Sequence, residues 1–444
     1  MDSEAIEVDA LVIGAGIAGL TVARDLAERG QSVMVVEVAD TIGGSAILSE
    51  GYVWTAPSLA AFRAEDPYGD DEKFLVMLRE LEPALDEITG AGINVGPLLT
   101  SVLDFGRGRQ IDIAAYLDWC ARSVTRNAGW IMLGHGPTEL LTADGAVVGA
   151  MVSNVSTGEK AEVRATSTVL ATGGFQASEQ NRLDYMGPWA ERLLLRANPL
   201  SVGTGIELGL TVGGILSSQM DRFYGHLVPF PLTVWNVGIF TRLTSYHSKF
   251  GLLFDRAGRR FTDESRGDHA NAQSVARQGR ALLFIDNRVW QSAANASPVE
   301  GMPSFDRVQD ARNFGAHASI ADTIEDLVRP AEQWGFDTAQ LVRTITAYNN
   351  GEVFPARGDI APLTDPPFAL VEVQAAITFT YGGLHTDVDG RVLNESGAAV
   401  QGLYAAGIDS GAVNAVGYTG GLVRGLTLGR ATARAIGDDH AGLT

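Results

Sequence analysis

Cysteine is almost absent from this chain, with Cys120 alone among 444 residues. A single thiol excludes an intrachain disulfide and is typical of a reducing compartment. The acidic start of the sequence lacks the basic region of a secretory signal. The seven histidines are scattered, without the close pairing that metal ligands need. We therefore expect a cytoplasmic protein without a bound metal.

Basic residues are also scarce, with 33 Lys and Arg against 53 Asp and Glu and a net charge of −20. No Lys/Arg-rich run is present to follow a phosphate backbone, so we expect no nucleic-acid partner. No apolar run reaches the roughly 18 residues that a membrane helix needs, so we expect no membrane span. The length and the 45% of hydrophobic residues suit two packed domains.

Glycine is plentiful, and the N-terminal segment arranges it as Gly14-Ala-Gly16-Ile-Ala-Gly19, after a short apolar run. The first glycine allows a sharp turn, the second lets backbone N–H groups approach a pyrophosphate, and the third lets a helix pack close to a strand. The predicted helix, Leu20 to Arg29, directs its positive end at the phosphates, and Glu37 ends the next strand, where it can accept ribose hydroxyls. This pattern predicts a dinucleotide site; a purely structural turn is the alternative.

Three further glycine segments suggest one elongated cofactor that touches both ends of the chain. They are Gly43-Gly44-Ser45, Ala171-Thr-Gly-Gly-Phe175 and Gly402-Leu-Tyr-Ala-Ala-Gly407. A second dinucleotide fingerprint is missing, because the segment from Gly203 to Gly209 has one residue too many between its last glycines. A separate NAD(P)H site is therefore not expected.

The order of these segments resembles the flavoprotein family of soluble fumarate reductases and 3-ketosteroid dehydrogenases, within the succinate dehydrogenase flavoprotein superfamily. Gly203-Thr-Gly205-Ile, Gly258-Arg-Arg-Phe-Thr-Asp-Glu264 and Tyr381-Gly-Gly-Leu384 also match the family. The resemblance implies an α/β fold with a Rossmann-like FAD-binding domain of the glutathione-reductase type, from residues 1–222 and 368–444. Residues 223–367 would form an inserted α+β capping domain.

The resemblance also implies that FAD is the cofactor. Relatives with covalent FAD use a histidine just after the glycine–serine motif, and this chain has none before His135, so we expect non-covalent FAD. Relatives often have Glu or Asn after the last Ala-Ala-Gly, whereas here Ile408 is followed by Asp409. The expected cofactor contacts are Gly14, Gly16, Ile17, Ala18, Gly19, Glu37, Val38, Gly43, Gly44, Ser45, Ala171, Thr172, Gly173, Gly407, Asp409, Gly421 and Leu422.

Tyr418 and Phe379 stand where dicarboxylate reductases of this family have the Arg and His that hold their substrate. An unpaired carboxylate in a dry pocket costs several kcal/mol, so a fumarate-like substrate is not expected. Tyr418, with the amides around Gly420-Gly421-Leu422, resembles the carbonyl-binding arrangement of ketosteroid dehydrogenases. The alternative is a packing role for Tyr418 at the turn.

The resemblance thus implies α,β-dehydrogenation of a small-molecule substrate, a cyclic ketone, by α-proton abstraction and β-hydride transfer to FAD. An external acceptor, which could be oxygen, a quinone or another protein, would then take the electrons. One alternative is the reverse chemistry, the reduction of an activated C=C bond in an enone or enoate. A further alternative is a flavin-binding protein without catalysis.

The proton-transfer residue of relatives lies four residues after the glutamate of the Gly-Arg-Arg-Phe motif, which gives Asp268 here. Asp268 or His269 could serve as base, and His269 has an unperturbed pKa near 6.5. Arg266 could be the donor if the alignment slips by two residues. The structural alternative makes Asp268 the N-cap of a helix from His269 to Arg277. Further candidates, each with a packing alternative, are Tyr224, His226, Tyr246, His247 and Tyr381.

Overall fold

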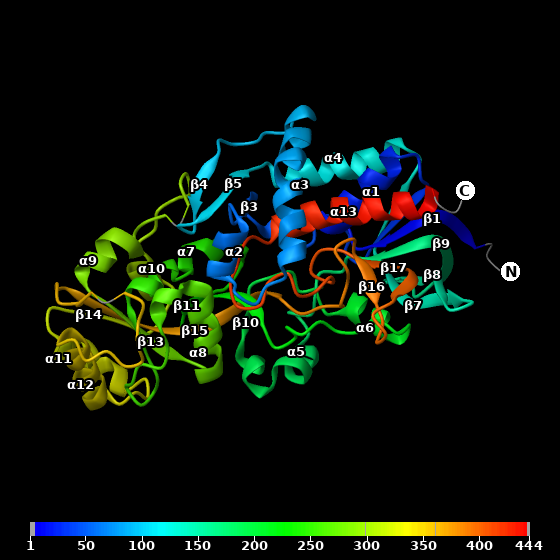
Figure 1. The fold of residues 1–444 in the computed structure, drawn as a ribbon. Helices are drawn as coiled ribbons and strands as arrows, with labels where there is room; N and C mark the ends of the chain where they lie inside the picture. The colour runs from blue at the N-terminus through cyan, green and yellow to red at the C-terminus, as the bar shows by residue number, and fades with distance from the viewer. Residues whose placement is uncertain (1–4, 298, 360, 442–444) are drawn as a thin grey trace. The chain divides into compact units, whose positions relative to one another are not determined.

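The chain folds into two compact units in a computed structural model that describes residues 5–297, 299–359 and 361–441 (Figure 1). The first unit combines residues 1–185, 197–222 and 379–444, so it draws on both ends of the sequence. The second unit consists of residues 186–196 and 223–378. Each unit is built around its own sheet.

The main sheet of the first unit has the strand order β16-β17-β9-β1-β2-β6, and β7 and β8 extend it beside β9. The pairs that join β1, β2, β6, β9 and β17 are parallel. Buried apolar runs form the end of β1, Ala10 to Ile13, and β2 up to Glu37, as expected for strands that are covered on both faces. The expected α/β fold with a parallel sheet is confirmed. The strands are β1 (Ile6–Ile13), β2 (Val33–Glu37), β6 (Trp130–Leu133), β7 (His135–Ala143), β8 (Ala146–Asn154), β9 (Lys160–Leu170), β16 (Arg391–Leu393) and β17 (Ala399–Ala405).

Four helices of the first unit pack together over one side of this sheet (Figure 1). They are α1 (Ile17–Glu28), α3 (Asp71–Gly90), α4 (Ile113–Arg126) and α13 (Leu422–Ala441). α13 approaches α1 closely, because a Cβ added at Gly425 would lie 2.6 Å from Cγ2 of Ile17. α1 begins three residues before the predicted Leu20, since Gly16 is its extended N-cap and Gly19 lies within its first turn.

Smaller elements complete the first unit. A three-stranded sheet holds β3 (Tyr52–Thr55), β5 (Gly106–Gln110) and β4 (Leu99–Val102) in that order. Short helices are α2 (Leu59–Glu65), α5 (Glu179–Met186), which ends at the start of the second unit, and α6 (Thr204–Thr211).

The second unit is built on a mixed sheet in which the long strand β15 pairs with β10, β11, β13 and β14. The unit extends beyond the predicted range 223–367, because β15 and its parallel partner β10 hold residues 368–378 and 186–196 in it. Its role as a cap stays a prediction. The strands are β10 (Leu194–Leu195), β11 (Phe223–Pro229), β12 (Leu252–Phe254), β13 (Ala281–Ile285), β14 (Ala318–Ala321) and β15 (Phe368–Thr380). The helices are α7 (Phe240–Leu243), α8 (Asp268–Gln278), α9 (Asn287–Val289), α10 (Arg307–Asn313), α11 (Ile324–Val328) and α12 (Thr338–Asn349).

Two features are absent from the described residues. None of the helices found there combines the length and the apolar character needed to cross a lipid bilayer. The same part of the chain contains no group of three or more His, Cys, Asp or Glu side chains placed to hold a metal ion.

Candidate cofactor site and active site

Of the three glycines in the turn between β1 and α1, two are packed closely against other atoms and one faces open space. Gly14 has φ +110°, and a Cβ there would lie 2.3 Å from the carbonyl oxygen of Ala171. A Cβ at Gly19 would lie 1.9 Å from the oxygen of Gly14. Gly16 differs, because an added Cβ meets nothing within 4 Å. The turn therefore leaves room at the positive end of α1, which fits the pyrophosphate of FAD.

Glu37 closes this turn from the end of β2. Its Oε2 accepts a hydrogen bond from Ala15 N at 2.7 Å, and its Oε1 accepts one from Ala39 N at 2.9 Å. Each carboxylate oxygen keeps a second lone pair, so Glu37 can still accept ribose hydroxyls. Val38, which follows, is 40% exposed.

The second glycine pair lies directly against the first turn. Gly43 N donates to Ala15 O at 2.8 Å, and a Cβ at Gly44 would lie 3.3 Å from Gly16 Cα. Ser45 follows as the N-cap of a short 3₁₀ helix, Ala46–Leu48. The structure thus brings together the segments Gly14–Gly19, Glu37–Val38 and Gly43–Ser45, as a shared cofactor contact requires.

Asp409 joins the segment after β17 to the turn that follows β9. Its carboxylate is fully buried and accepts hydrogen bonds from the backbone N–H of Thr172, from Thr172 Oγ1 at 2.9 Å and from Gly174 N at 3.0 Å. Burial raises the pKa of Asp409, and these donors oppose the rise. The geometry favours a role in fixing the Ala171–Gly173 turn, and direct contact of Asp409 with the cofactor stays a prediction.

Tyr418 lies on a half-buried turn just before α13. Its hydroxyl oxygen accepts a hydrogen bond from Gly421 N at 3.1 Å, and Leu422 is the first residue of the helix. The Tyr418 ring meets Trp54 edge to face, with centroids 5.4 Å apart, and lies 6.1 Å from the ring of Phe379. The one polar group of Tyr418 is therefore set among aromatic rings and a backbone donor.

Two buried side chains hold the loop that carries Tyr418. Asp66 accepts from Ala415 N at 2.7 Å, Val416 N at 3.1 Å and Asn414 Nδ2 at 3.2 Å. The Tyr381 hydroxyl donates to Gly417 O, and burial raises its pKa well above 10. This position favours support of the loop by Tyr381, and its predicted catalytic role stays a prediction. Sequence reasoning missed Asp66, because an acid after a short helix carries no local signal.

In the second unit, Asp268 pairs with His226 of β11. Oδ2 of Asp268 bonds Nδ1 of His226, and Oδ1 accepts from Leu227 N at 3.2 Å. The N-cap of α8 is Gly267, so the alternative that makes Asp268 the N-cap is wrong. Glycine takes that place because its φ is +99°, which leaves the Asp268 side chain free to reach β11. Burial lowers the pKa of His226 to about 4, with Arg196 contributing, so the imidazole is neutral at pH 7.

Tyr246 and His247 lie beside this pair. The Tyr246 ring is 5.4 Å from His226, and the Arg307 guanidinium lies 5.3 Å from its centroid. Burial raises the pKa of Tyr246, and nearby Arg196 and Arg307 oppose the rise. Burial also lowers the pKa of His247 to about 3, and its Nδ1 has no hydrogen-bond partner in the described part of the chain.

The other two proton-transfer candidates are placed differently. His269 is buried in the first turn of α8, with its ring 6.5 Å from Tyr224. Arg266 is exposed on the 3₁₀ turn before the helix. The structure thus gathers Asp268, His226 and Tyr246, and leaves Arg266 on the surface.

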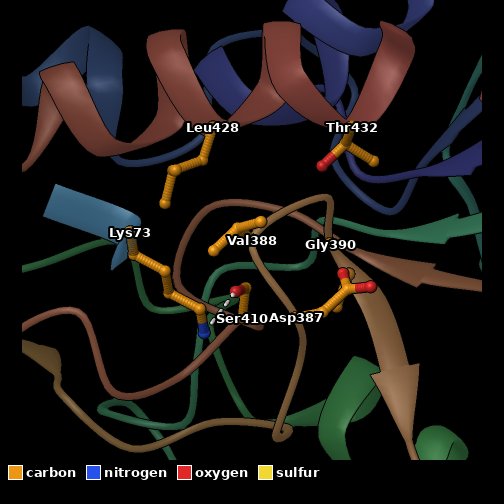
Figure 2. A pocket seen from close by; sticks show the side chains of 8 residues that line it. Lys73, Asp387, Val388, Gly390, Ser410, Leu428 and Thr432 are labelled. Atoms are coloured by element: carbon orange, nitrogen blue, oxygen red, sulfur yellow. Dashed lines mark hydrogen bonds between the residues drawn. The ribbon is translucent and has the colours of Figure 1, made fainter. Parts of the chain in front are cut away.

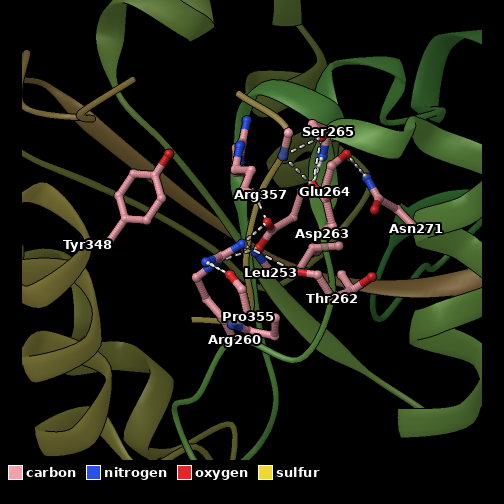
Figure 3. Close-up of polar contacts among 12 residues, drawn as sticks. Leu253, Arg260, Thr262, Asp263, Glu264, Ser265, Asn271, Tyr348, Pro355 and Arg357 are labelled. Atoms are coloured by element: carbon pink, nitrogen blue, oxygen red, sulfur yellow. Dashed lines mark hydrogen bonds and ion pairs between the residues drawn. The ribbon is translucent and has the colours of Figure 1, made fainter. Parts of the chain in front are cut away.

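The Gly-Arg-Arg-Phe motif ends in a buried ion network (Figure 3). Glu264 is fully buried, accepts from Leu253 N and Arg260 Nε at 2.9 Å each, and lies 3.6 Å from Arg357 Nη1. Its backbone oxygen accepts from Asn271 Nδ2 at 3.0 Å. This network fixes the turn that leads into α8 and therefore sets where Asp268 lies.

Comparison with known proteins places these features in a family. The family model described as "FAD binding domain" matches residues 9–82 and 101–421. A fumarate reductase (cytochrome) of Shewanella frigidimarina is 25% identical, over 93% of this chain and 74% of the relative. A urocanate reductase of Eggerthella lenta is 24% identical over 91% and 70%, respectively. A 3-oxosteroid 1-dehydrogenase of Mycolicibacterium smegmatis is 26% identical over 65% and 55%.

Solved structures share the fold. A 3-ketosteroid Δ4-(5α)-dehydrogenase from Rhodococcus jostii RHA1 gives a TM-score of 0.75 at 21% identity and covers 98% of both chains. A flavocytochrome c3 fumarate reductase gives 0.71 at 20% identity over 98% of this chain and 79% of that one. The chain therefore belongs to the FAD-binding flavoprotein family of fumarate reductases and 3-ketosteroid dehydrogenases, and it is an FAD-dependent oxidoreductase that acts on CH–CH groups.

Proposed function

We propose that the protein is a dehydrogenase that introduces a C=C bond next to the carbonyl of a cyclic ketone. The observation that carries this proposal is the setting of Tyr418, a hydroxyl bonded to Gly421 N and surrounded by Trp54 and Phe379. Dicarboxylate reductases of the family have Arg and His at the positions of Tyr418 and Phe379. An aromatic surface with one hydroxyl suits an apolar carbonyl compound better than a dianion.

Tyr418 is suited to hold the carbonyl oxygen. Its oxygen accepts a hydrogen bond from Gly421 N at 3.1 Å, and a hydroxyl that accepts one hydrogen bond is a stronger donor. Loss of the α-proton places negative charge on the carbonyl oxygen, which such a donor stabilises. Removing one donor of this kind costs about 2.7–4 kcal/mol in known enzymes.

FAD, when bound, accepts the hydride from the β-carbon. The residues that would hold it are the turn Gly14–Gly19, Glu37, the segment Gly43–Ser45 and the turn Ala171–Gly173. Gly407, Gly421 and Leu422 would complete the contacts from the C-terminal part of the chain. The open space at Gly16 and the remaining lone pairs of Glu37 support this assignment.

Within the second unit, His226 is the side chain best arranged to accept a proton. Asp268 holds its Nδ1, which fixes the tautomer and leaves Nε2 as the basic nitrogen. The buried imidazole is neutral at pH 7, as a base must be. The Tyr246 hydroxyl, whose ring is 5.4 Å from that of His226, keeps its proton at pH 7, because burial raises its pKa, so it is a candidate donor rather than a base.

The reverse reaction, reduction of an activated C=C bond, is the second candidate function. One observation favours it: the fumarate and urocanate reductases match 93% and 91% of this chain, whereas the steroid dehydrogenase matches 65%. In that reaction the Tyr246 hydroxyl is the candidate proton donor, because neutral His226 carries no proton on Nε2.

Anaerobic mixing separates the two functions. The oxidised holoprotein is mixed with a panel of cyclic ketones, including 3-ketosteroids, with succinate as the matched control. We expect loss of the oxidised-flavin absorbance with at least one ketone and none with succinate. If no ketone reduces the flavin, and the dithionite-reduced protein is instead rapidly reoxidised by an enoate, the protein is a reductase. If neither reaction occurs, the flavin serves no such catalysis.

A further inference from the structure

Two buried cations hold the segment 407–411, which follows β17 and contains the predicted cofactor contact Gly407. Nζ of Lys73 donates to Gly411 O at 2.9 Å. It also donates to Ser410 Oγ at 3.5 Å (Figure 2). Arg424 of α13 donates from Nε to Gly407 O at 3.1 Å and from Nη2 to Ser410 O. Lys73 is 2% exposed and Arg424 is fully buried.

Neither cation has an ion-pair partner among the residues that the structure describes. Asp387 lines the same small pocket as Lys73 without pairing with it (Figure 2). Nη1 of Arg424 is buried and lacks a hydrogen bond within the described ranges. Burial lowers the pKa of Lys73 to about 8 and that of Arg424 to about 10. An unpaired buried charge is costly, and the carboxylates that act on these cations, Asp70 and Asp387 on Lys73 and Asp409 on Arg424, form no ion pair with them.

Two other buried arginines of the molecule contact an anion within the protein directly. Arg24 pairs with Asp25 and with Glu87, the latter at 2.8 Å. Arg260 pairs with Glu264. The cations at segment 407–411 differ from these two arginines, because their hydrogen bonds go to neutral oxygens, as do those of the buried Arg307.

The position of these cations indicates a further anion that they would stabilise. A Cβ at Gly407 would lie 2.8 Å from Ala18 Cβ, and one at Gly425, next to Arg424, would lie 2.6 Å from Ile17. Ile17 and Ala18 begin α1, directly after the open space at Gly16. Family membership supplies an anionic cofactor, FAD, for this turn. The two cations thus lie beside the segments predicted to hold that cofactor.

We propose that Lys73 and Arg424 form an electrostatic clamp that raises the reduction potential of the bound FAD. Uptake of two electrons and one proton adds one negative charge to the cofactor, and buried positive charge nearby stabilises that product. A raised potential favours removal of hydride from a saturated carbon. This inference depends on FAD binding alone and stands whichever substrate the protein uses.

Charge-removing and charge-keeping variants test the clamp. Lys73→Gln and Arg424→Gln keep a hydrogen-bond donor and lose the charge, and Arg424→Lys keeps the charge. Arg434→Gln is the matched control, since Arg434 lies on the same helix but is 44% exposed and paired with Glu80. The midpoint potential of each holoprotein is measured by equilibration with a reference dye, and the melting temperature of each apoprotein is recorded beside it.

We expect Lys73→Gln and Arg424→Gln each to shift the reduction equilibrium about tenfold toward oxidised FAD, which corresponds to about 30 mV for a two-electron couple. Arg424→Lys and Arg434→Gln should stay near the wild-type potential. A lowered melting temperature with an unchanged potential in both charge-removing variants would show a purely structural role and overturn the proposal. If Arg424→Gln retains no FAD, Lys73→Gln decides, and a wild-type potential in that variant overturns the clamp.

Discussion

The two regions that carry candidate chemistry differ in the kind of residue that surrounds them. Around Tyr418 the partners are aromatic rings and backbone groups, and the anchor of the loop, Asp66, binds N–H donors only. Around His226 the neighbours are ionisable, and the anchor of the preceding turn, Glu264, binds guanidinium groups. The difference teaches that a buried carboxylate can be satisfied by several neutral donors or by arginine. The two solutions should respond differently to mutation and to pH.

Loss of the charge at Glu264 should have the largest effect on stability. Glu264→Gln leaves Arg260 buried without its ion-pair partner and should lower the free energy of unfolding by about 3–5 kcal/mol. Asp326→Asn is the control in the same unit, because Asp326 pairs with Arg329 at the surface, where the side chains are 55% and 73% exposed. That variant should lose less than about 1 kcal/mol. Denaturant unfolding measures both, and equal losses would contradict the distinction.

The Asp66 anchor should give an intermediate effect that extends to function. Asp66→Ala leaves the N–H groups of Ala415 and Val416 unsatisfied and should cost about 1–3 kcal/mol. The loosened loop should also slow flavin reduction by the ketone. Asp66→Asn keeps one acceptor oxygen, so it should lose less stability and less of the flavin-reduction rate. A variant that is destabilised but reacts at the wild-type rate would show that Asp66 does not position Tyr418.

Acid should weaken the region around His226 gradually. The pKa of His226 is lowered to about 4 and that of His247 to about 3, against about 6.5 when unfolded. Between these values the unfolded chain binds more protons, so stability falls as pH drops below about 6.5. Each histidine contributes at most about 1.4 kcal/mol per pH unit. The free energy of unfolding of the wild type and of His226→Asn is measured between pH 4.5 and 7. Identical slopes of this free energy against pH in the two proteins would argue against a buried neutral His226.

The sequence predicts features whose requirements are local. Gly14 needs a positive φ, and Gly19 must lack a Cβ, so the cofactor turn is readable from a few neighbours. The apolar runs likewise predict the parallel strands. The helix start is not readable in this way: the pattern begins at Leu20, whereas α1 begins at Ile17, because Ala18 and Gly19 add no apolar periodicity.

The features that sequence reasoning missed depend on partners far apart in the chain. Asp66 meets Val416 across 350 residues, and Lys73 meets Gly411 across 338. Asp268 drew attention through its place after a motif, but its partner His226 lies 42 residues away. No local pattern marks such pairs, because their geometry exists only once the elements have packed.

The most direct test of the proposed function is the reduction half-reaction of Tyr418→Phe with the cyclic ketone that reduces the wild-type protein fastest. The substitution keeps the ring between Trp54 and Phe379 and removes only the hydroxyl. Stopped-flow mixing without oxygen should show flavin reduction about 10²-fold slower or more, with FAD content and melting temperature retained. A rate within about twofold of wild type, outside the 10²–10³ range for loss of such a donor, would reduce Tyr418 to a packing residue and contradict the account.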